Sequence, residues 1–179
     1  MLSAVELFSY LMDLMNDRLS AIQNFVAIDD RLATAGQPNP FQFGLIKAAG
    51  YSTVINLALS SSTDALNDEN ALARSAWLDY IHIPVVWEKP TMMDFELFVQ
   101  VMKRRQTQKC FIHCAKNMRV SVFVYLWRRI YEKVPHDIAQ RSIDAVWVPN
   151  DIWQLFLESV LKHHENLSEI QSNSSQSLS

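Results

Sequence analysis

The chain has 179 residues, a formal net charge of −3 and 49% hydrophobic residues. This length suits one domain of ordinary size, and the composition excludes the disordered, collagenous and membrane-protein classes. The weakly acidic charge, with no stretch dominated by lysine and arginine, argues against nucleic acid as a partner. No uninterrupted apolar run reaches the ~18 residues that span a bilayer. Two cysteines are too few for a secreted disulfide framework. We therefore expect no membrane partner and a cytoplasmic location.

Residues 1–23 predict an amphipathic helix added to the domain. Ser3 followed by Glu6 is the pattern of a capping box, and apolar residues recur at helical spacing through about Met15. The next stretch, residues 24–38, predicts two short strands around a turn.

Strands and helices alternate through the middle of the chain. Branched and aromatic residues mark the strands, while helical propensity and helix-starting residues mark the helices. The expected strands are 52–59, 79–85 and 109–113, and the expected helices are 38–51, 67–78 and 91–106. Strands separated by helices of this length indicate a mostly parallel sheet covered on both faces.

The last third of the chain predicts helices only. Residues 119–133 contain valines that favour a strand, but their length without a turn signal leads us to interpret them as a buried helix. Two more helices, 135–146 and 149–164, each begin at a proline. The polar composition of residues 166–179 predicts a disordered tail, which leaves a single domain at 24–165.

The stretch FIHCAKNMRVS, residues 111–121, carries the chemistry. A buried strand is followed by Cys114, a tight turn, Arg119 and a helix, so the backbone amides of the turn and of the helix start converge on one spot. This arrangement favours a bound phosphate, and the same field stabilises a thiolate at Cys114. The planar fork of Arg119 can hold two equatorial oxygens of a phosphoryl group.

We expect the residues around Cys114 to support its chemistry. The predicted phosphate loop consists of Ala115, Lys116, Asn117, Met118 and Arg119. Asn117 stands where such a loop usually needs glycine, and asparagine is well tolerated at positive φ. Lys116 adds positive charge at the entrance. We expect His113 to fix the loop geometry rather than transfer protons, and Ser121 to donate a hydrogen bond to the thiolate.

This stretch resembles the phosphate-binding signature of cysteine-dependent phosphatases, in which His-Cys, a short loop, Arg and a Ser or Thr form the site. DDRLATAGQP, AAGYSTVINLA, LDYIHIPV and PNDIWQLF look like the small bacterial phosphatase-like domain also found attached to beta-lactamase-like hydrolases. The resemblance covers roughly residues 24–162. It implies an α/β fold of the dual-specificity-phosphatase type, with a central mostly parallel sheet of four to five strands flanked by helices on both faces.

The resemblance also implies that Cys114 is the nucleophile and Arg119 the phosphate-binding residue. The loop departs from the pattern of tyrosine phosphatases, which place five residues, with a glycine among them, between Cys and Arg. This chain places four residues there and has no glycine after Gly50. A shorter loop encloses a smaller or differently oriented anion, and rhodanese-like sulfurtransferases also use short cysteine loops.

Two carboxylates compete to be the acid that protonates the leaving oxygen. Asp94 lies three residues after Thr91, where a carboxylate caps its own helix, so we give it a structural role. Glu88 lies in a Trp-Glu-Lys-Pro loop that is similar to the mobile acid-bearing loop of tyrosine phosphatases. We therefore favour Glu88 as the acid, with a solvated glutamate in an ordinary loop as the alternative.

The favoured function is a cysteine-dependent phosphatase that hydrolyses a phosphomonoester, phosphotyrosine among the candidates, through a phosphocysteine intermediate. One alternative is a sulfurtransferase that carries a persulfide on Cys114, and another is a catalytically weak module that binds a phosphorylated ligand. No metal-ligand spacing occurs, and we expect no cofactor. The expected partner is a phosphorylated protein or a small phosphoester, and the oligomeric state is left open.

Overall fold

A computed structural model describes the backbone of Ser3, Glu6 and residues 18–176. Most of the helix predicted within residues 1–23 lies outside the described residues. At its start, the backbone N–H of Ser3 donates to Oε2 of Glu6 at 2.8 Å, and that of Glu6 donates to Oγ of Ser3 at 3.2 Å. These are the two hydrogen bonds of the predicted capping box.

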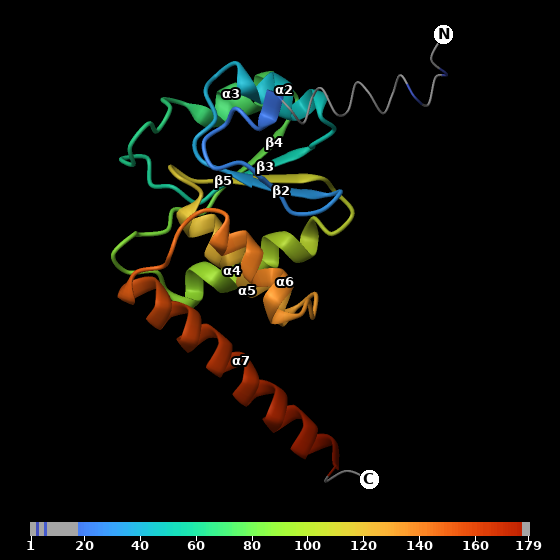
Figure 1. Ribbon diagram of the computed structural model, residues 1–179, viewed down its shortest axis with the longest axis vertical. Coiled ribbons are helices and arrows are strands. Elements are labelled where there is room, and N and C mark those ends of the chain that lie inside the picture. The colour runs from blue at the N-terminus through green and yellow to red at the C-terminus, as the bar shows by residue number, and fades with distance from the viewer. Residues whose placement is uncertain (1–2, 4–5, 7–17, 177–179) are drawn as a thin grey trace.

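Five strands form one sheet in the order β1-β2-β5-β3-β4 (Figure 1). The strands are β1 (Val26–Ala27), β2 (Leu32–Ala35), β3 (Thr53–Asn56), β4 (Asp79–His82) and β5 (Cys110–His113). β1 pairs with β2 in antiparallel fashion, and the other three pairings are parallel. The predicted mostly parallel sheet of four to five strands is confirmed.

The register of the sheet brings the ends of its parallel strands to one edge. His113, the last residue of the central strand β5, lies opposite Ala35 on one side and Asn56 on the other. Asn56 in turn lies opposite His82. Because ligands bind outside the carboxyl ends of parallel strands, this edge is the expected place for a site.

The helices cover both faces of the sheet, with α2 and α3 on one side and α4 to α7 on the other (Figure 1). They are α2 (Gln42–Ala48), α3 (Glu69–Ser75), α4 (Met92–Arg104), α5 (Met118–Ile130), α6 (His136–Asp144) and α7 (Asp151–Gln176). Each helix predicted from residue 38 onward is present. The ambiguous stretch 119–133 forms most of α5. Nine consecutive residues of that helix are buried, so tertiary packing outweighs the strand preference of its valines.

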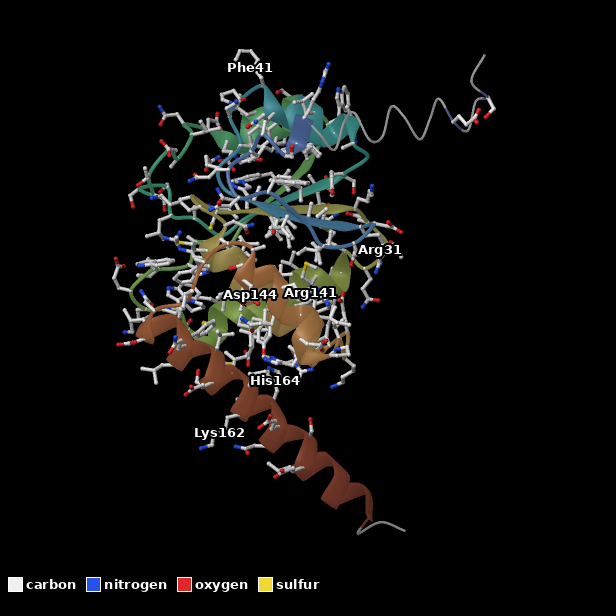
Figure 2. All side chains as sticks on the ribbon, viewed as in Figure 1. Arg31, Phe41, Arg141, Asp144, Lys162 and His164 are labelled. Carbon is white, nitrogen blue, oxygen red and sulfur yellow. The ribbon has the colours of Figure 1, made fainter. Side chains whose placement is uncertain are left out.

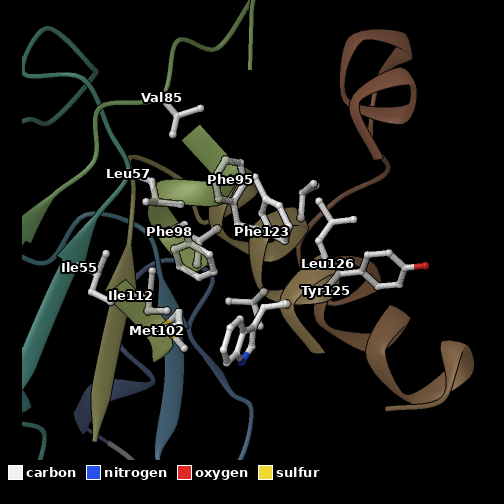
Figure 3. Close-up of a cluster of buried hydrophobic side chains, with 14 of the residues drawn as sticks. Ile55, Leu57, Val85, Phe95, Phe98, Met102, Ile112, Phe123, Tyr125 and Leu126 are labelled. Atoms are coloured by element: carbon white, nitrogen blue, oxygen red, sulfur yellow. The ribbon is translucent and has the colours of Figure 1, made fainter. Parts of the chain in front are cut away.

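Side-chain alternation along the strands divides the core in two. On β5, Cys110 and Ile112 join the cluster under α4 and α5, while Phe111 joins the cluster under α2 and α3. Aromatic rings from α4 and α5 fill the larger cluster, where Phe98 and Phe123 meet edge to face with centroids 5.5 Å apart (Figure 3). Burial of one such side chain contributes roughly 1.5–3 kcal/mol.

α7 is longer than the sequence predicted and projects away from the domain (Figure 1). Its first turns are anchored by buried Trp153, Phe156 and Val160. Further along, the ring of His164 (Figure 2) packs edge to face against that of Phe95, with the ring centroids 6.1 Å apart. The structure gives residues 166–176 a helical backbone where a disordered tail was predicted. Extending a helix already nucleated by packing costs little per residue, so polar composition alone did not end it.

Within the part of the chain that the structure describes, no helix has both the length and the apolar character needed to cross a bilayer.

Candidate active site

The cysteine loop joins the end of β5 to the start of α5. Asn117 precedes the helix with φ 63°, in the left-handed region. The positive φ predicted for Asn117 is therefore confirmed, and it turns the chain directly from the strand into the helix. The first amides of an α-helix have no partner within the helix, so the amino end of α5 presents donors and a positive dipole to the space above Cys114.

The loop forms part of a pocket of about 590 Å³. Its lining residues are Leu59, Ser61, Ser62, Thr63, Trp87, Glu88, Cys114, Ala115, Lys116, Met118 and Arg119. Cys114 and Arg119 belong to this lining although they are only 0% and 7% exposed. The structure thus brings the predicted nucleophile, arginine and acid to one pocket. Asn117 is the one predicted loop residue that does not line it.

Arg119 packs against an aromatic ring and has a buried hydrogen-bond donor that is unpaired among the described residues. Its guanidinium carbon lies 5.4 Å from the ring centroid of Trp87. The Trp87 ring packs in turn against Trp147 and Trp153, with centroids 5.3 and 5.2 Å away. Nε of Arg119 is buried and has no hydrogen-bond partner among the described residues. Because buried donors are nearly always satisfied, an anion in the pocket is the fitting partner.

The loop is fixed from below by the segment that follows β2. The backbone N–H of Gln37 donates to the carbonyl of Ala115 at 3.1 Å. A Cβ at Gly36 would lie 2.9 Å from that same carbonyl oxygen, so only glycine permits this approach. No role in the site was predicted for Gly36, because the contact joins segments that lie far apart in the chain.

The side chain of Asn117 anchors the loop instead of facing a ligand. Its Nδ2 donates to the carbonyl of Asn24 at 2.6 Å and to Oγ1 of Thr34 at 2.9 Å. Asn117 is fully buried in this position. Its backbone thus turns the loop into α5, whereas its side chain points toward β2.

Ser121 makes different contacts from those predicted. Its hydroxyl donates to the carbonyl of Met118 at 2.9 Å and accepts a hydrogen bond from Nε1 of Trp147 at 3.1 Å. The expected donation to the Cys114 thiolate is not formed in this arrangement, because the one hydroxyl hydrogen is used within the helix.

His113 lies behind the loop, on the opposite face of the sheet from Cys114, as strand alternation requires. It is fully buried, and its Nε2 lies 2.8 Å from Oε1 of Glu69. This position agrees with the expected role in loop geometry and keeps the ring out of the pocket. Glu69 was missed in the sequence, where it read as one of several polar residues at a helix start.

The two candidate acids are separated by the structure. Glu88 lines the pocket with Cys114 and Arg119. Asp94 does not, and it forms a complete capping box with Thr91 at the start of α4. Its Oδ2 accepts a hydrogen bond from the backbone N–H of Thr91 at 2.9 Å. The structural role predicted for Asp94 is confirmed.

Among the described residues, no group of three or more histidine, cysteine or acidic side chains is arranged to hold a metal ion. Both cysteines are free thiols.

A cysteine and an arginine at the carboxyl edge of a parallel sheet, joined by a loop that ends in a helix amino terminus, define a protein of the dual-specificity-phosphatase fold. Comparison with known families agrees. Residues 27–149 match the family described as "DSP-PTPase phosphatase fused to NAD+ kinase", and the chain belongs to this cysteine-phosphatase-like family.

Individual relatives are similar over different spans. The beta-lactamase hydrolase-like protein of Xylella fastidiosa (strain Temecula1 / ATCC 700964) is 30% identical over 115 residues, which are 63% of this chain and 26% of that protein. The chain thus spans about a quarter of the length of this curated relative. A crystal structure of a candidate phosphatase (DUF442) from Shewanella putrefaciens CN-32 is 34% identical, with a TM-score of 0.76, and covers 83% of this chain and 97% of its own.

A more distant structure shares the fold alone. PTPMT1, solved in complex with PI(5)P, is 15% identical with a TM-score of 0.66, over 80% of this chain and 98% of its own. The central sheet and its flanking helices are therefore those of the phosphatases, as expected.

Proposed function

We propose that this protein is a cysteine-dependent phosphatase that hydrolyses a phosphomonoester through a phosphocysteine intermediate on Cys114. The observation that carries the proposal is the common pocket of Cys114, Arg119 and Glu88 at the amino end of α5. Family membership and the shared fold support a phosphatase.

Substrate binding uses donors that the protein leaves available. The phosphoryl oxygens accept hydrogen bonds from the first-turn amides of α5 and from Arg119, whose buried Nε has no partner among the residues that the structure describes. Lys116, exposed at the pocket, adds a second positive charge that attracts the anion. Charge on the equatorial oxygens grows toward the transition state, so these fixed donors stabilise it more than the bound ester.

Catalysis proceeds in two displacements. The Cys114 thiolate attacks phosphorus in line, the sulfur–phosphorus bond forms, the ester oxygen leaves, and Glu88 gives that oxygen its proton. Water then attacks the phosphocysteine, Glu88 takes a proton from the water, and the sulfur–phosphorus bond breaks to release inorganic phosphate and the thiolate. Glu88 thus ends the cycle protonated again, with water as the source of the proton.

The substrate class we propose is a phosphorylated protein or a small phosphoester. PTPMT1, which shares the fold, was solved in complex with PI(5)P. In this chain the pocket lining includes Ser61, Ser62 and Thr63, whose hydroxyls suit a polar phosphoester.

The test is an assay of the wild type, Cys114→Ser and Arg119→Ala with p-nitrophenyl phosphate and, separately, with thiosulfate plus cyanide. We expect phosphate release by the wild type, none above background with Cys114→Ser, and a loss of about 10²–10³-fold with Arg119→Ala. Phosphate release that survives Cys114→Ser contradicts the nucleophile. Thiocyanate formation without phosphate release supports a sulfurtransferase instead, and phosphate binding without either activity supports a binding module.

A further inference from the structure

A buried polar cluster centred on Glu69 lies directly behind the cysteine loop. Glu69 is the first residue of α3, and its side chain is 5% exposed. Its Oε1 lies 2.8 Å from Nε2 of His113 and accepts a hydrogen bond from Nδ2 of Asn56 at 3.1 Å. Its Oε2 accepts one from Nε2 of Gln37 at 2.6 Å. Side chains from the ends of β5 and β3 and from the segment after β2 thus converge on one carboxylate.

Glu69 is ionised at neutral pH. Burial by itself raises its pKa, but the hydrogen bond and attraction from His113, together with hydrogen bonds from Gln37 and Tyr80, outweigh burial and leave the pKa lowered. A carboxylate only accepts hydrogen bonds, so the hydrogen of the histidine contact lies on Nε2 of His113.

Three of these donors, His113, Gln37 and Asn56, connect Glu69 to the site, and the first two hold the loop that contains the nucleophile. His113 is bonded directly to Cys114, so fixing its ring fixes the backbone on the amino side of the nucleophile. Gln37 acts on the other side, because its backbone N–H donates to the carbonyl of Ala115 at 3.1 Å. Glu69 therefore restrains the chain immediately before and immediately after Cys114.

The third donor connects the cluster to the opposite wall of the pocket. Asn56 gives its Nδ2 to Glu69 and accepts the backbone N–H of Ala58 on its Oδ1 at 2.7 Å. Ala58 leads into residues 59–63, most of which line the pocket. Both walls of the pocket are thereby connected by hydrogen bonds to the buried carboxylate of Glu69.

Helix capping does not account for this placement. Asp68 performs that task for α3, since its side chain accepts the backbone N–H of Ala71. A buried carboxylate is also a weak source of net stability, because the cost of removing it from water offsets most of what its hydrogen bonds contribute. What a buried carboxylate with several donors does well is to fix the geometry of the groups that donate to it.

We propose that Glu69 is a positioning residue for the phosphate loop: by accepting hydrogen bonds from His113, Gln37 and Asn56, it holds the backbone around Cys114 in its anion-binding arrangement. The kinetic consequence rests on the proposed phosphatase function. The effect on the Cys114 thiol does not, because it is measured without turnover.

The first test compares Glu69→Gln, which keeps the shape and removes the charge, with Asp68→Ala, which alters the neighbouring exposed acid. With p-nitrophenyl phosphate we expect Glu69→Gln to lower kcat/KM by about 10²-fold, mainly through kcat, and Asp68→Ala to change it less than about twofold. His113→Asn is expected to act through the same contact, so the double variant should be no slower than the slower single variant.

The second test measures the alkylation rate of Cys114 by iodoacetamide across pH, with thermal unfolding to show that each variant is folded. We expect the Glu69→Gln profile to move to higher pH. Unchanged kinetics and an unchanged alkylation profile, with only a lower Tm, overturn the proposal. A move of the profile to lower pH reveals a direct charge effect and overturns it too.

Where Glu69→Gln does not fold, Gln37→Met replaces it. An alkylation profile of Gln37→Met that equals that of the wild type then overturns the proposal. An inactive wild type contradicts the phosphatase function alone.

Discussion

Two pockets of similar size, about 540 and 590 Å³, lie at opposite ends of β5, and each has a cysteine and an arginine in its lining. Cys110 and Arg105 belong to the first, and Cys114 and Arg119 to the second. The difference is the direction of the helices. α5 turns its amino end toward Cys114, whereas its last turn and the carboxyl end of α4 face the Cys110 pocket. A helix carboxyl end repels the anion that an amino end attracts.

The thiol in the first pocket is also shifted toward its neutral form. Burial raises the pKa of Cys110 to about 11, and the attraction of Arg105 and Arg31 reduces this rise only in part. Arg31 is one of the side chains labelled in Figure 2. A cysteine and an arginine beside a cavity are therefore insufficient for an anion site. The carboxyl ends of parallel strands and a helix amino terminus must also meet there.

The largest predicted difference between the two pockets is in thiol reactivity. At pH 7 a thiol with a pKa of about 11 is ionised to roughly one part in 10⁴, so Cys110 should be nearly inert to iodoacetamide. We expect Cys114 to react at least about 10³-fold faster and inorganic phosphate to protect it. Peptide mass spectrometry of the alkylated protein measures both rates. Cys110→Ala serves as the control and should retain activity. Equal labelling of the two cysteines would mean that the two pockets do not differ in thiol reactivity.

A smaller effect on kcat should distinguish Glu88 from Asp94, the two candidate acids for the Cys114 pocket. Glu88→Gln should lower kcat for an ester with a poor leaving group by about 10²-fold, because the leaving oxygen loses its proton donor. Asp94→Asn should leave kcat near wild type and lower stability by about 0.3–1 kcal/mol through its capping box. Steady-state kinetics across pH and urea unfolding measure these outcomes, and the reverse pattern would transfer the acid role to Asp94.

The smallest effect concerns stability in acid. The folded-state pKa of Glu69 lies below its ordinary value of 4.5, so its contribution to stability is fully present above that pH and is lost as the pH falls through the folded pKa. The free energy of unfolding of the wild type, measured with urea, should fall as the pH drops below 4.5. Glu69→Gln should lose less over the same range. Identical acid dependence in both proteins would mean that Glu69 titrates alike in the folded and unfolded states.

Local patterns predicted the fold and the centre of the site. The strand Cys110–His113, the turn at Asn117 and the buried helix after it are encoded by neighbouring residues, so Cys114 and Arg119 were found together. The wider site was not predictable in this way. Glu69 is separated from His113 by 44 positions, and the approach of Gly36 to Ala115 joins the segments that follow the neighbouring strands β2 and β5. Such contacts arise from the pairing of β2, β3 and β5, which a sequence pattern does not display.

Ser121 shows the same limit from the other direction. Its spacing from Arg119 indicated a hydrogen bond to the thiolate, yet Trp147 and the carbonyl of Met118 engage its hydroxyl. A residue type at a suitable distance in the chain thus predicts a possible partner, and tertiary packing selects the actual one. The length of α7 follows the same rule, because anchoring by Trp153 outweighed the polar composition of its last turns.

Transfer of a phosphoryl group to Cys114 is the step on which the proposed function depends, and we propose to trap that intermediate. In Glu88→Gln the first displacement from p-nitrophenyl phosphate proceeds, because p-nitrophenolate leaves without a proton, while hydrolysis loses its base. Rapid quenching and peptide mass spectrometry should then find one phosphoryl group on the peptide that contains Cys114, and none when Cys114 is serine. Steady release of phosphate with no adduct on Cys114, or an adduct elsewhere that survives Cys114→Ser, would contradict the account.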